Sequence, residues 1–332
     1  MQTVKTAIIG TGTMGRKYAQ MIAEGKALPL TLAAVVCRHA EGQQWAKDIL
    51  PATVRVCSSV EELYDHEQEF EAVLVVTPHS LHPELVMQAF THGKHVLCDK
   101  PSASSLAPAL EMNRAAEQSG LVFAMMFHQR RYRKYQRLYQ LVHSGQLGQV
   151  RRIQLENSRY FRTWMYHRSG SWRSSWAGEG GGALLNQGQH ILDIWQWLFG
   201  MPQSIYAVIP YGKYNEFAVD DEATLLMEYP DNCTAAFILT TGEGSYTERL
   251  RVVGTKATAL LEEDTLTVET YGEDVETYRR RADCTARQEL AATRTTEEFG
   301  VQEEPYPAML HNFGEAILHG EALTAPGVEG VR

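Results

Sequence analysis

A glycine-rich segment between an apolar run and an amphipathic run constrains the fold of this 332-residue chain more than any other feature. Residues 4–9 form a short apolar run, and the sequence GTGTMG follows at positions 10–15. Apolar residues then recur at helical spacing to about residue 24, and a second apolar, β-branched run occupies 30–37. Strand, glycine turn, helix and strand in this order predict a βαβ unit.

The same alternation continues to about residue 127. Apolar strands are expected at 72–76, 95–98 and 121–127, with helices at 83–91 and 106–119 between them. Apolar strands separated by helices predict a parallel sheet that is covered on both faces. We therefore expect a doubly wound Rossmann domain at residues 1–128.

The pattern changes beyond this point. Helices are expected at 132–144, 183–199 and 307–320, and short strands with turn signals repeat between 204 and 268. Repeated strands without intervening helices predict an antiparallel sheet. The fold class is thus α/β, with an α+β substrate-binding domain, built on an open and mainly antiparallel sheet, at residues 129–332.

Composition excludes several functions. The 31 Lys and Arg against 40 Asp and Glu give a net charge of −9, which argues against binding to nucleic acid or to an anionic membrane. Five cysteines without a C-x-x-C pair are typical of a reduced, cytoplasmic chain without a zinc knuckle. No apolar run approaches the ~18 residues of a membrane span, and the N-terminus lacks the long apolar segment of a signal peptide.

The glycine segment is the candidate dinucleotide site. Gly10 permits a tight turn, Gly12 lets the backbone approach a pyrophosphate, and Gly15 lets helix and strand pack closely. The following helix offers N–H groups to phosphates. We expect Thr11, Thr13 and Met14 to contact the cofactor as well. The alternative is a purely structural glycine turn.

The second strand ends in Cys37 and Arg38, and no carboxylate appears before Glu41. An NAD site usually has an acid here for the ribose 2′-hydroxyl, whereas an arginine suits a 2′-phosphate. Arg38 therefore favours NADP over NAD. The alternatives are a solvated surface arginine and an NAD site served by Cys37 or by the backbone.

Two groups of polar residues are candidates for catalysis. Asp99 and Lys100 follow a strand, where ligands bind in open α/β sheets. A lysine near a cationic nicotinamide can hold or release a proton near neutral pH. Asn186 and His190 are four residues apart, which would place them on one helical face next to Asp193. The alternatives are a loop lysine and a packed helix histidine.

Two further segments complete the candidate site. Thr77, Pro78, His79 and His82 end another strand, so we expect them beside the cofactor rather than at a metal. Aromatic residues crowd the segment between 160 and 176, and their flat faces suit sugar rings. Its candidate substrate-binding residues are Tyr160, Trp164, Trp172 and Arg173. A satellite core or a subunit interface would explain these aromatic residues nearly as well.

Four motifs together resemble the glucose–fructose oxidoreductase/inositol dehydrogenase (Gfo/Idh/MocA) family over nearly the whole chain. They are GTGTMG at 10–15, TPHSLH at 77–82, GKHVLCDKP at 93–101 and GGGALLNQGQH at 180–190 with Asp193. The resemblance implies NAD(P)-dependent oxidation or reduction of sugars, cyclitols or their derivatives. It implies Lys100 and His190 as catalytic residues, and a homodimer or homotetramer formed through the C-terminal sheet.

The sequence departs from the family pattern at three places. Asp99 replaces the family's glutamate, and Asn186 replaces the aspartate of inositol dehydrogenase-like members. Asn186 can orient a substrate but cannot hold a charge, which weakens an assignment to inositol dehydrogenase. The motif LNQG at 185–188, with Trp172, Arg173 and Trp176 upstream, resembles a branch of the family that we expect to act on sugars or glycosides. The chain also stops at Arg332, where family members usually continue into a last helix.

We therefore expect an oxidoreductase that moves a hydride between nicotinamide and a carbinol or keto carbon. One alternative is an enzyme whose bound NAD assists glycoside cleavage or epimerisation. The other is a non-catalytic sensor that binds a dinucleotide and regulates a partner.

Overall fold

The computed structural model describes residues 2–170, 173–214, 216–283, 285 and 290–332. The chain divides into two compact units, which are treated separately below. Unit 1 contains residues up to Arg131, together with Ala177–Gly180 and Glu304–Arg332. Unit 2 contains Tyr132–Trp176 and Gly181–Glu303.

Unit 1 is built on a six-stranded parallel sheet with the strand order β3-β2-β1-β4-β5-β6. Its strands are β1 (Val4–Ile9), β2 (Leu30–Val36), β3 (Arg55–Cys57), β4 (Ala72–Val75), β5 (His95–Cys98) and β6 (Phe123–Met125). The order reverses between β1 and β4, and ligands of open α/β sheets bind at such a switch point. The predicted Rossmann fold is confirmed.

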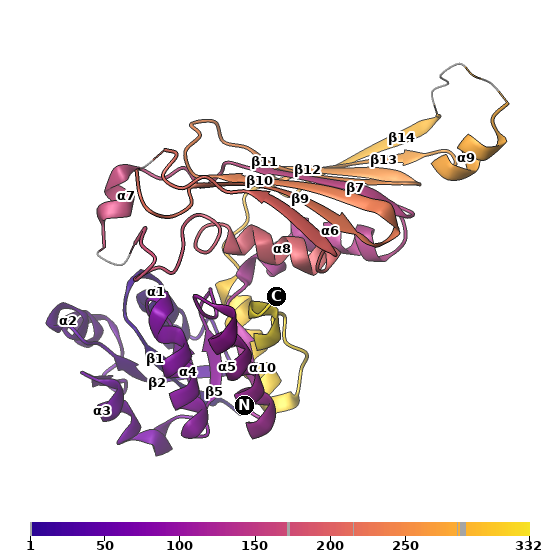
Figure 1. Ribbon diagram of the computed structural model, residues 1–332. Helices are drawn as coiled ribbons and strands as arrows, with labels where there is room; N and C mark the ends of the chain where they lie inside the picture. The colour runs from indigo at the N-terminus through magenta and orange to yellow at the C-terminus, as the bar shows by residue number, and fades with distance from the viewer. Residues whose placement is uncertain (1, 171–172, 215, 284, 286–289) are drawn as a thin grey trace. The chain divides into compact units, whose positions relative to one another are not determined.

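Helices cover this sheet on both faces (Figure 1). They are α1 (Thr13–Ala23), α2 (Ala40–Ile49), α3 (Val60–Tyr64), α4 (His82–Thr91), α5 (Leu106–Ser119) and α10 (Tyr306–His319). Local signals set their ends: the Ser59 hydroxyl accepts a hydrogen bond from the Glu62 N–H at the start of α3, and Gly120 ends α5 with φ +68°. All four residues of β4 are fully buried, as expected for a strand covered on both sides.

The last 29 residues belong to unit 1, whereas the sequence analysis placed them in the second domain, after a boundary between residues 128 and 129. Met309, Leu310 and Phe313 of α10 lie in the same core as β1 and β2. A side chain at Gly314 would meet Pro29 at 2.7 Å, so α10 packs closely against the segment before β2. The apolar face of α10 is thus buried on the Rossmann sheet, which its position in the sequence does not reveal.

Unit 2 is built on an eight-stranded sheet with the order β14-β13-β12-β11-β7-β10-β9-β8. Its strands are β7 (Val150–Asn157), β8 (Ser204–Val208), β9 (Glu222–Tyr229), β10 (Cys233–Thr240), β11 (Glu248–Gly254), β12 (Ala257–Glu262), β13 (Thr265–Tyr271) and β14 (Ala292–Glu298). Only the β7–β10 pair is parallel among these strands. The predicted mainly antiparallel sheet is confirmed.

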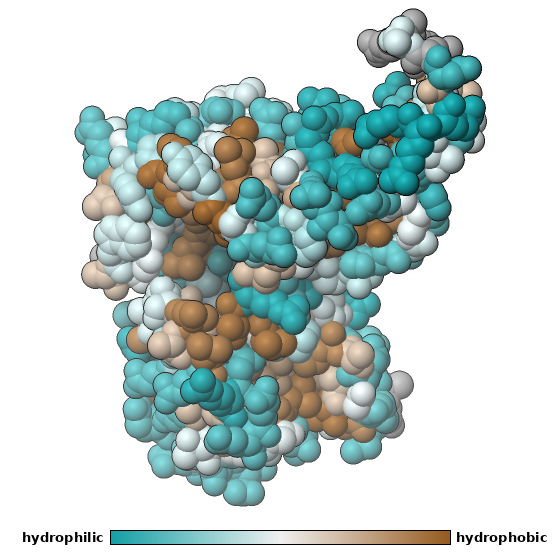
Figure 2. All heavy atoms as spheres, turned by 45° about the vertical axis from the view of Figure 1, so that its right-hand side comes forward, coloured by the Kyte–Doolittle hydropathy of each residue, from teal (hydrophilic) through white to brown (hydrophobic). Residues whose placement is uncertain are grey.

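Two helices, α6 (Arg133–His143) and α8 (Gln189–Phe199), lie against one face of this sheet (Figure 1). Alternate strand residues such as Leu155, Phe237 and Val252 form the core on that face. The hairpin of β13 and β14, with α9 (Val275–Arg281) between its strands, extends beyond the rest of the sheet. Hydrophilic residues cover most of its surface (Figure 2).

The helix expected at 183–199 begins only at Gln189, so the prediction for residues 183–188 is wrong. The carboxylate of Asp220 accepts hydrogen bonds from the N–H groups of Gly182 (2.8 Å) and Leu184 (2.7 Å). These bonds hold residues 183–188 in a series of turns. Asn186 therefore precedes α8, while His190 is its second residue. None of the helices in the described ranges is long and apolar enough to cross a bilayer.

Candidate functional site

The glycine turn between β1 and α1 shows which glycines the protein itself requires. Gly10 has φ +103°, and a Cβ there would meet the carbonyl oxygen of Val76 at 2.4 Å. A Cβ at Gly15 would meet the carbonyl oxygen of Gly10 at 1.9 Å. Gly12 differs, because its φ is −70° and no atom lies within 4 Å of a Cβ built there. Packing does not require glycine at position 12, whereas close approach of a pyrophosphate does.

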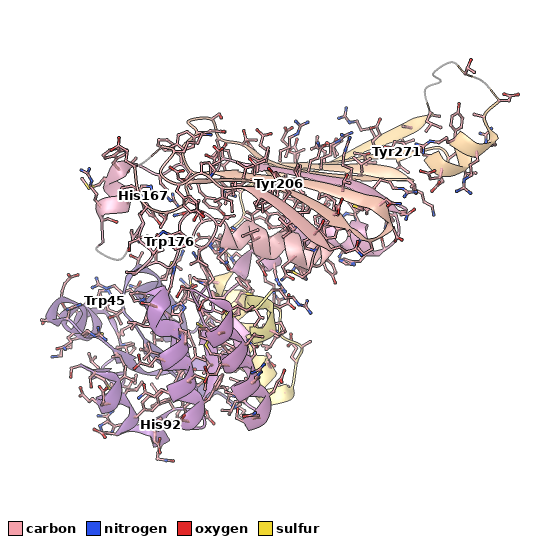
Figure 3. All side chains as sticks on the ribbon, viewed as in Figure 1. Trp45, His92, His167, Trp176, Tyr206 and Tyr271 are labelled. Carbon is pink, nitrogen blue, oxygen red and sulfur yellow. The ribbon has the colours of Figure 1, made fainter. Side chains whose placement is uncertain are left out.

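The residues after β2 lie at the predicted ribose position. Cys37 is buried, and burial raises the pKa of its thiol, so it remains protonated at neutral pH. Arg38 is exposed. The Arg16 guanidinium, absent from our sequence prediction, donates to the carbonyl of Thr11 and to the carboxylate of Glu41, both at 3.0 Å. It also lies 5.2 Å from the ring of Trp45, which Figure 3 labels on α2.

The two histidines after β4 are buried and bind backbone carbonyls. His82 Nδ1 lies 2.7 Å from the carbonyl oxygen of Pro101, and its Nε2 lies 2.8 Å from that of Thr77. His82 therefore links the segments that follow β4 and β5. His79 Nδ1 lies 3.1 Å from the carbonyl oxygen of Glu179, within unit 1. Pro78 is exposed, and Thr77 Oγ1 is buried without a hydrogen-bond partner in the described part of the chain.

Asp99 and Lys100 directly follow β5, between the ends of β4 and β6. The Asp99 carboxylate accepts a hydrogen bond from the N–H of Lys100 at 2.8 Å, and burial raises the pKa of this carboxyl. His128 follows β6 and was missed in the sequence. Burial lowers its pKa to about 4, so its imidazole is neutral at pH 7. The available signal was its position as a polar residue directly after the strand expected at 121–127.

The carboxyl edge of the Rossmann sheet thus brings together the predicted residues of unit 1. The glycine turn, Cys37, the segment 77–82 and Asp99–Lys100 all follow strands β1, β2, β4 and β5. Their proximity follows from the parallel order, because carboxyl ends of parallel strands share one edge. The open position at Gly12 and the helix N-terminus beside it fit a dinucleotide phosphate.

In unit 2 two of the predicted residues, Arg173 and Asn186, lie around Tyr166, an aromatic residue of the segment expected to bind the substrate. The Tyr166 hydroxyl, on α7 (Trp164–Arg168), accepts a hydrogen bond from Arg173 at 2.7 Å. The side-chain amides of Gln187 and Asn186 approach the same oxygen at 3.1 and 3.4 Å. The structure therefore joins Arg173 to Asn186 through Tyr166.

The remaining aromatic residues have separate surroundings. Trp164 is 44% exposed, and its ring lies 6.3 Å from that of Phe217. Tyr160 is half-buried. Trp176 donates from its indole nitrogen to the carbonyl of Ala218 at 2.7 Å (Figure 3 labels Trp176 and His167). Trp172 lies outside the described residues.

Asn186 and His190 were expected on one helical face, but only His190 lies on the helix. Asn186 is buried in the turns before α8, and His190 is half-buried in its first turn. Asp193, three residues after His190, is buried. The N–H of Asn186 donates to the carbonyl of Gly182 at 3.0 Å.

Comparison with known proteins identifies two family domains in the chain. Residues 4–127 match the oxidoreductase family with an NAD-binding Rossmann fold, and residues 135–260 match the GFO/IDH/MocA C-terminal domain. The WlbA dehydrogenase from Bordetella pertussis, solved with NADH and UDP-GlcNAcA, has the same fold. It superimposes with a TM-score of 0.79 at 20% identity, over 99% of this chain and 92% of the other.

Several curated relatives have assigned activities, and two of them are described here. The NADP(+) scyllo-inositol 2-dehydrogenase IolU of Bacillus subtilis is 29% identical, over 68% of this chain and 66% of its own length. The 2,7-anhydro-N-acetylneuraminate hydratase of Mediterraneibacter gnavus is 30% identical, over 70% and 60%. The alignments thus span less than two thirds of either relative. With both domains matched in order, the chain belongs to the Gfo/Idh/MocA family of NAD(P)-binding oxidoreductases.

Proposed function

We propose that this protein transfers a hydride between a nicotinamide cofactor and a carbinol or keto carbon of a sugar, glycoside or cyclitol. The open position at Gly12 carries this proposal, because it leaves room for a pyrophosphate where the protein's own packing requires no glycine. The scyllo-inositol dehydrogenase activity of the Bacillus relative supports the substrate class.

Lys100 and His190 are the proposed catalytic residues, and Asn186 positions the substrate. The bound nicotinamide supplies or accepts the hydride. Lys100 and His190 take up or return the hydroxyl proton, since an amine and an imidazole both exchange protons near neutral pH in suitable surroundings. Tyr160, Trp164 and Arg173 are proposed to bind the sugar, and Thr77, Pro78 and the Asp99–Lys100 segment to border the cofactor.

We propose NADP as the preferred cofactor. Arg38 is the second residue after β2 and is exposed, so its guanidinium can reach a 2′-phosphate. The Bacillus relative is named for NADP(+). Fluorescence titration with NADPH and NADH tests this choice in the wild type and in Arg38→Gln. Tighter NADPH binding that disappears in the variant is expected, and a wild-type preference for NADH would refute it.

The central test is Lys100→Met. We expect this variant to bind the cofactor as the wild type does but to lose about 10²–10⁴-fold in kcat, the usual contribution of a positioned acid or base. A panel of sugars, glycosides and cyclitols with both cofactors provides the substrate, and nicotinamide absorbance provides the rate. Turnover by Lys100→Met equal to that of the wild type would contradict the role of Lys100.

A second candidate function is glycoside cleavage or epimerisation assisted by a tightly bound NAD. The relative named a 2,7-anhydro-N-acetylneuraminate hydratase favours it, since hydration involves no net oxidation. Copurified cofactor, and product formation without any net change in nicotinamide absorbance, would distinguish it from a dehydrogenase.

A homodimer or homotetramer formed through the open sheet face of unit 2 is also proposed. Tyr206, Val208, Leu226 and Ile238 are exposed on this face, with Tyr206 labelled on β8 in Figure 3. The same face presents both arginines and glutamates, including Arg152 and Glu156, so two copies can pair opposite charges. Light scattering of the wild type and of Leu226→Asp tests it: the wild type should be oligomeric and the variant smaller.

A further inference from the structure

His82 is a buried titratable residue to which the proposed mechanism assigns no role. It is the first residue of α4, and it is fully buried. Its two ring nitrogens lie 2.7 Å from the carbonyl oxygen of Pro101 and 2.8 Å from that of Thr77. Neither oxygen accepts a hydrogen bond from any other group in the described part of the chain. His82 is therefore the donor on which both carbonyls depend.

The two contacts determine how many protons the ring of His82 carries. A carbonyl oxygen only accepts hydrogen bonds, so a ring nitrogen that faces one must carry a hydrogen. A neutral imidazole has one N–H group, and its other nitrogen presents a lone pair. The neutral ring would thus leave one of the two carbonyls buried and unsatisfied, which native proteins rarely tolerate. Only an imidazolium ion donates to both carbonyls.

The charge of an imidazolium at this position is opposed by some groups and favoured by others. Burial lowers the pKa of His82, while the Pro101 carbonyl and the charge of Asp99 raise it. The N-terminus of α4 also disfavours a positive charge. Burial in turn raises the pKa of Asp99, so the two side chains compete for one proton. The contacts place this proton on His82, because Asp99 faces the N–H donor of Lys100 at 2.8 Å.

The same contacts fix the backbone on both sides of Lys100. The N–H of Asp99, which precedes Lys100, donates to the carbonyl of Val75 at 2.9 Å. Pro101, which follows Lys100, presents its carbonyl to His82. Lys100 and Asp99 also interact with His82 electrostatically. The proposed base is thus held between the end of β4 and the start of α4.

We propose that His82 is a positioning residue, protonated throughout the neutral pH range, which fixes the Lys100 segment and balances the charge of Asp99. This inference rests on the proposed function and specifies how the chain prepares its base. Since the pair is neutral as a whole, no unbalanced carboxylate holds Lys100 as an ammonium ion, and its amine can accept a hydroxyl proton. His79 is the other titratable ring nearby, with 6.0 Å between ring centres, and its Nδ1 faces the carbonyl of Glu179.

Nitrogen-15 NMR of the protein labelled at histidine, without cofactor, tests the protonation directly. At about pH 8.5 an ordinary histidine, with a pKa of about 6.5, is neutral. We expect an imidazole with both nitrogens protonated, which is absent from His82→Gln and retained in His92→Gln. His92, labelled in Figure 3, is the matched control, because its Nδ1 faces the Glu67 carboxylate at 2.6 Å and is the other contact that favours a proton.

Two spectra would overturn the protonated state of His82. They are a wild-type spectrum in which every imidazole is neutral at this pH, and a protonated signal that persists in His82→Gln. Asp99→Asn identifies the signal even if His82→Gln does not fold, because it keeps the ring and removes its counter-charge. In that protein the signal should lose its proton at a lower pH than in the wild type, and an unchanged midpoint would exclude Asp99 as the counter-charge.

The effect on Lys100 is measured by the pH dependence of kcat for substrate oxidation. His82→Gln leaves Asp99 without its counter-charge, which stabilises the ammonium form of Lys100. The acidic limb of the profile should therefore move to higher pH by about one unit. A double variant with His82→Gln and Asp99→Asn again has no net charge at the pair, so its limb should return to the wild-type position. A merely structural loss would lower kcat in both variants without this reversal.

An unmoved limb in His82→Gln, or a double variant whose limb stays shifted, would contradict the effect on Lys100. Failure of the proposed function looks different, because no sugar, glycoside or cyclitol then changes nicotinamide absorbance in any of the proteins. The reaction of Lys100 with dinitrofluorobenzene, followed by mass spectrometry over a pH series, reports its amine without turnover. The same shift and the same reversal are expected there, and their absence would refute the role of His82.

Discussion

The two units position their polar groups in different ways. In unit 1 the candidate residues follow parallel strands, so the backbone of a buried sheet places them at one edge. In unit 2 they lie on a long segment and in turns, and side-chain hydrogen bonds around Tyr166 and Asp220 hold them. The comparison indicates that substitutions in unit 1 affect the protein mainly through the backbone. Substitutions in unit 2 affect it through particular polar side-chain contacts.

The largest expected effect on stability is in unit 2, at Glu248. Its buried carboxylate accepts hydrogen bonds from Lys134 (2.9 Å), Tyr135 (2.5 Å) and Arg159 (2.7 Å). Burial opposes its charge, but Lys134, Tyr135 and Arg159 together hold the pKa of this carboxyl below its usual value. Glu248→Gln should lower the free energy of unfolding towards the lower end of about 3–5 kcal/mol, because the buried Lys134 then keeps only the partly exposed Asp264, 3.2 Å away, as a counter-charge.

Urea unfolding measures this effect, and Glu297→Gln is the matched control. Glu297 pairs with Arg137 at 3.3 Å, and both side chains are more than one third exposed. Such surface pairs contribute about 0–1 kcal/mol. Equal losses in the two variants would show that polar contacts do not dominate the stability of unit 2.

A smaller, pH-dependent effect is expected in unit 1 at His128. Burial lowers its pKa to about 4, whereas the unfolded chain has an ordinary histidine pKa of about 6.5. Between these values only the unfolded chain binds the proton, so stability falls as pH is lowered from about 6.5 towards 4. By pH 5 the loss amounts to about 2 kcal/mol.

His128→Phe keeps a ring beside Tyr306, 4.3 Å away, and removes the titrating group. The free energy of unfolding, measured at pH 7.5 and pH 5 for both proteins, should fall less in the variant. Identical pH dependence in the two proteins would exclude His128 as the cause.

The smallest energetic effect is expected at Gly12. Alanine is compatible with φ −70° and meets no atom within 4 Å, so Gly12→Ala should leave Tm nearly unchanged. Its methyl group would occupy the space for a pyrophosphate and should weaken cofactor binding about tenfold or more, equivalent to about 1.4 kcal/mol.

Gly10→Ala provides the contrast, since its Cβ would collide with the Val76 carbonyl and destabilise unit 1 as well. Calorimetry for Tm and fluorescence titration for cofactor affinity separate the two variants. A Gly12→Ala protein with unchanged cofactor affinity would contradict the assigned cofactor site.

The sequence predicted the Rossmann unit in detail because its signals are local. Apolar strand runs, Gly10, Ser59 and Gly120 act within a few residues, and parallel topology then brings the strand ends together. This reasoning placed Lys100 after β5, and it also located the family motifs. The same reasoning would have found His128, had each residue that follows a strand been considered.

Other features depended on contacts between distant residues. The segment expected to begin a helix at residue 183 is bound at Leu184 by the carboxylate of Asp220, 36 positions away, and the helix begins only at Gln189. The apolar face of α10 returns to β1 and β2 from the far end of the chain. Tyr166 becomes central only because Arg173, Asn186 and Gln187 converge on its hydroxyl. The sequence by itself determined the elements and the chemistry of the strand ends, because short-range sterics and hydrophobic periodicity specify them. The tertiary structure decided which polar side chains contact one another, because these contacts depend on packing between residues that are distant in the sequence.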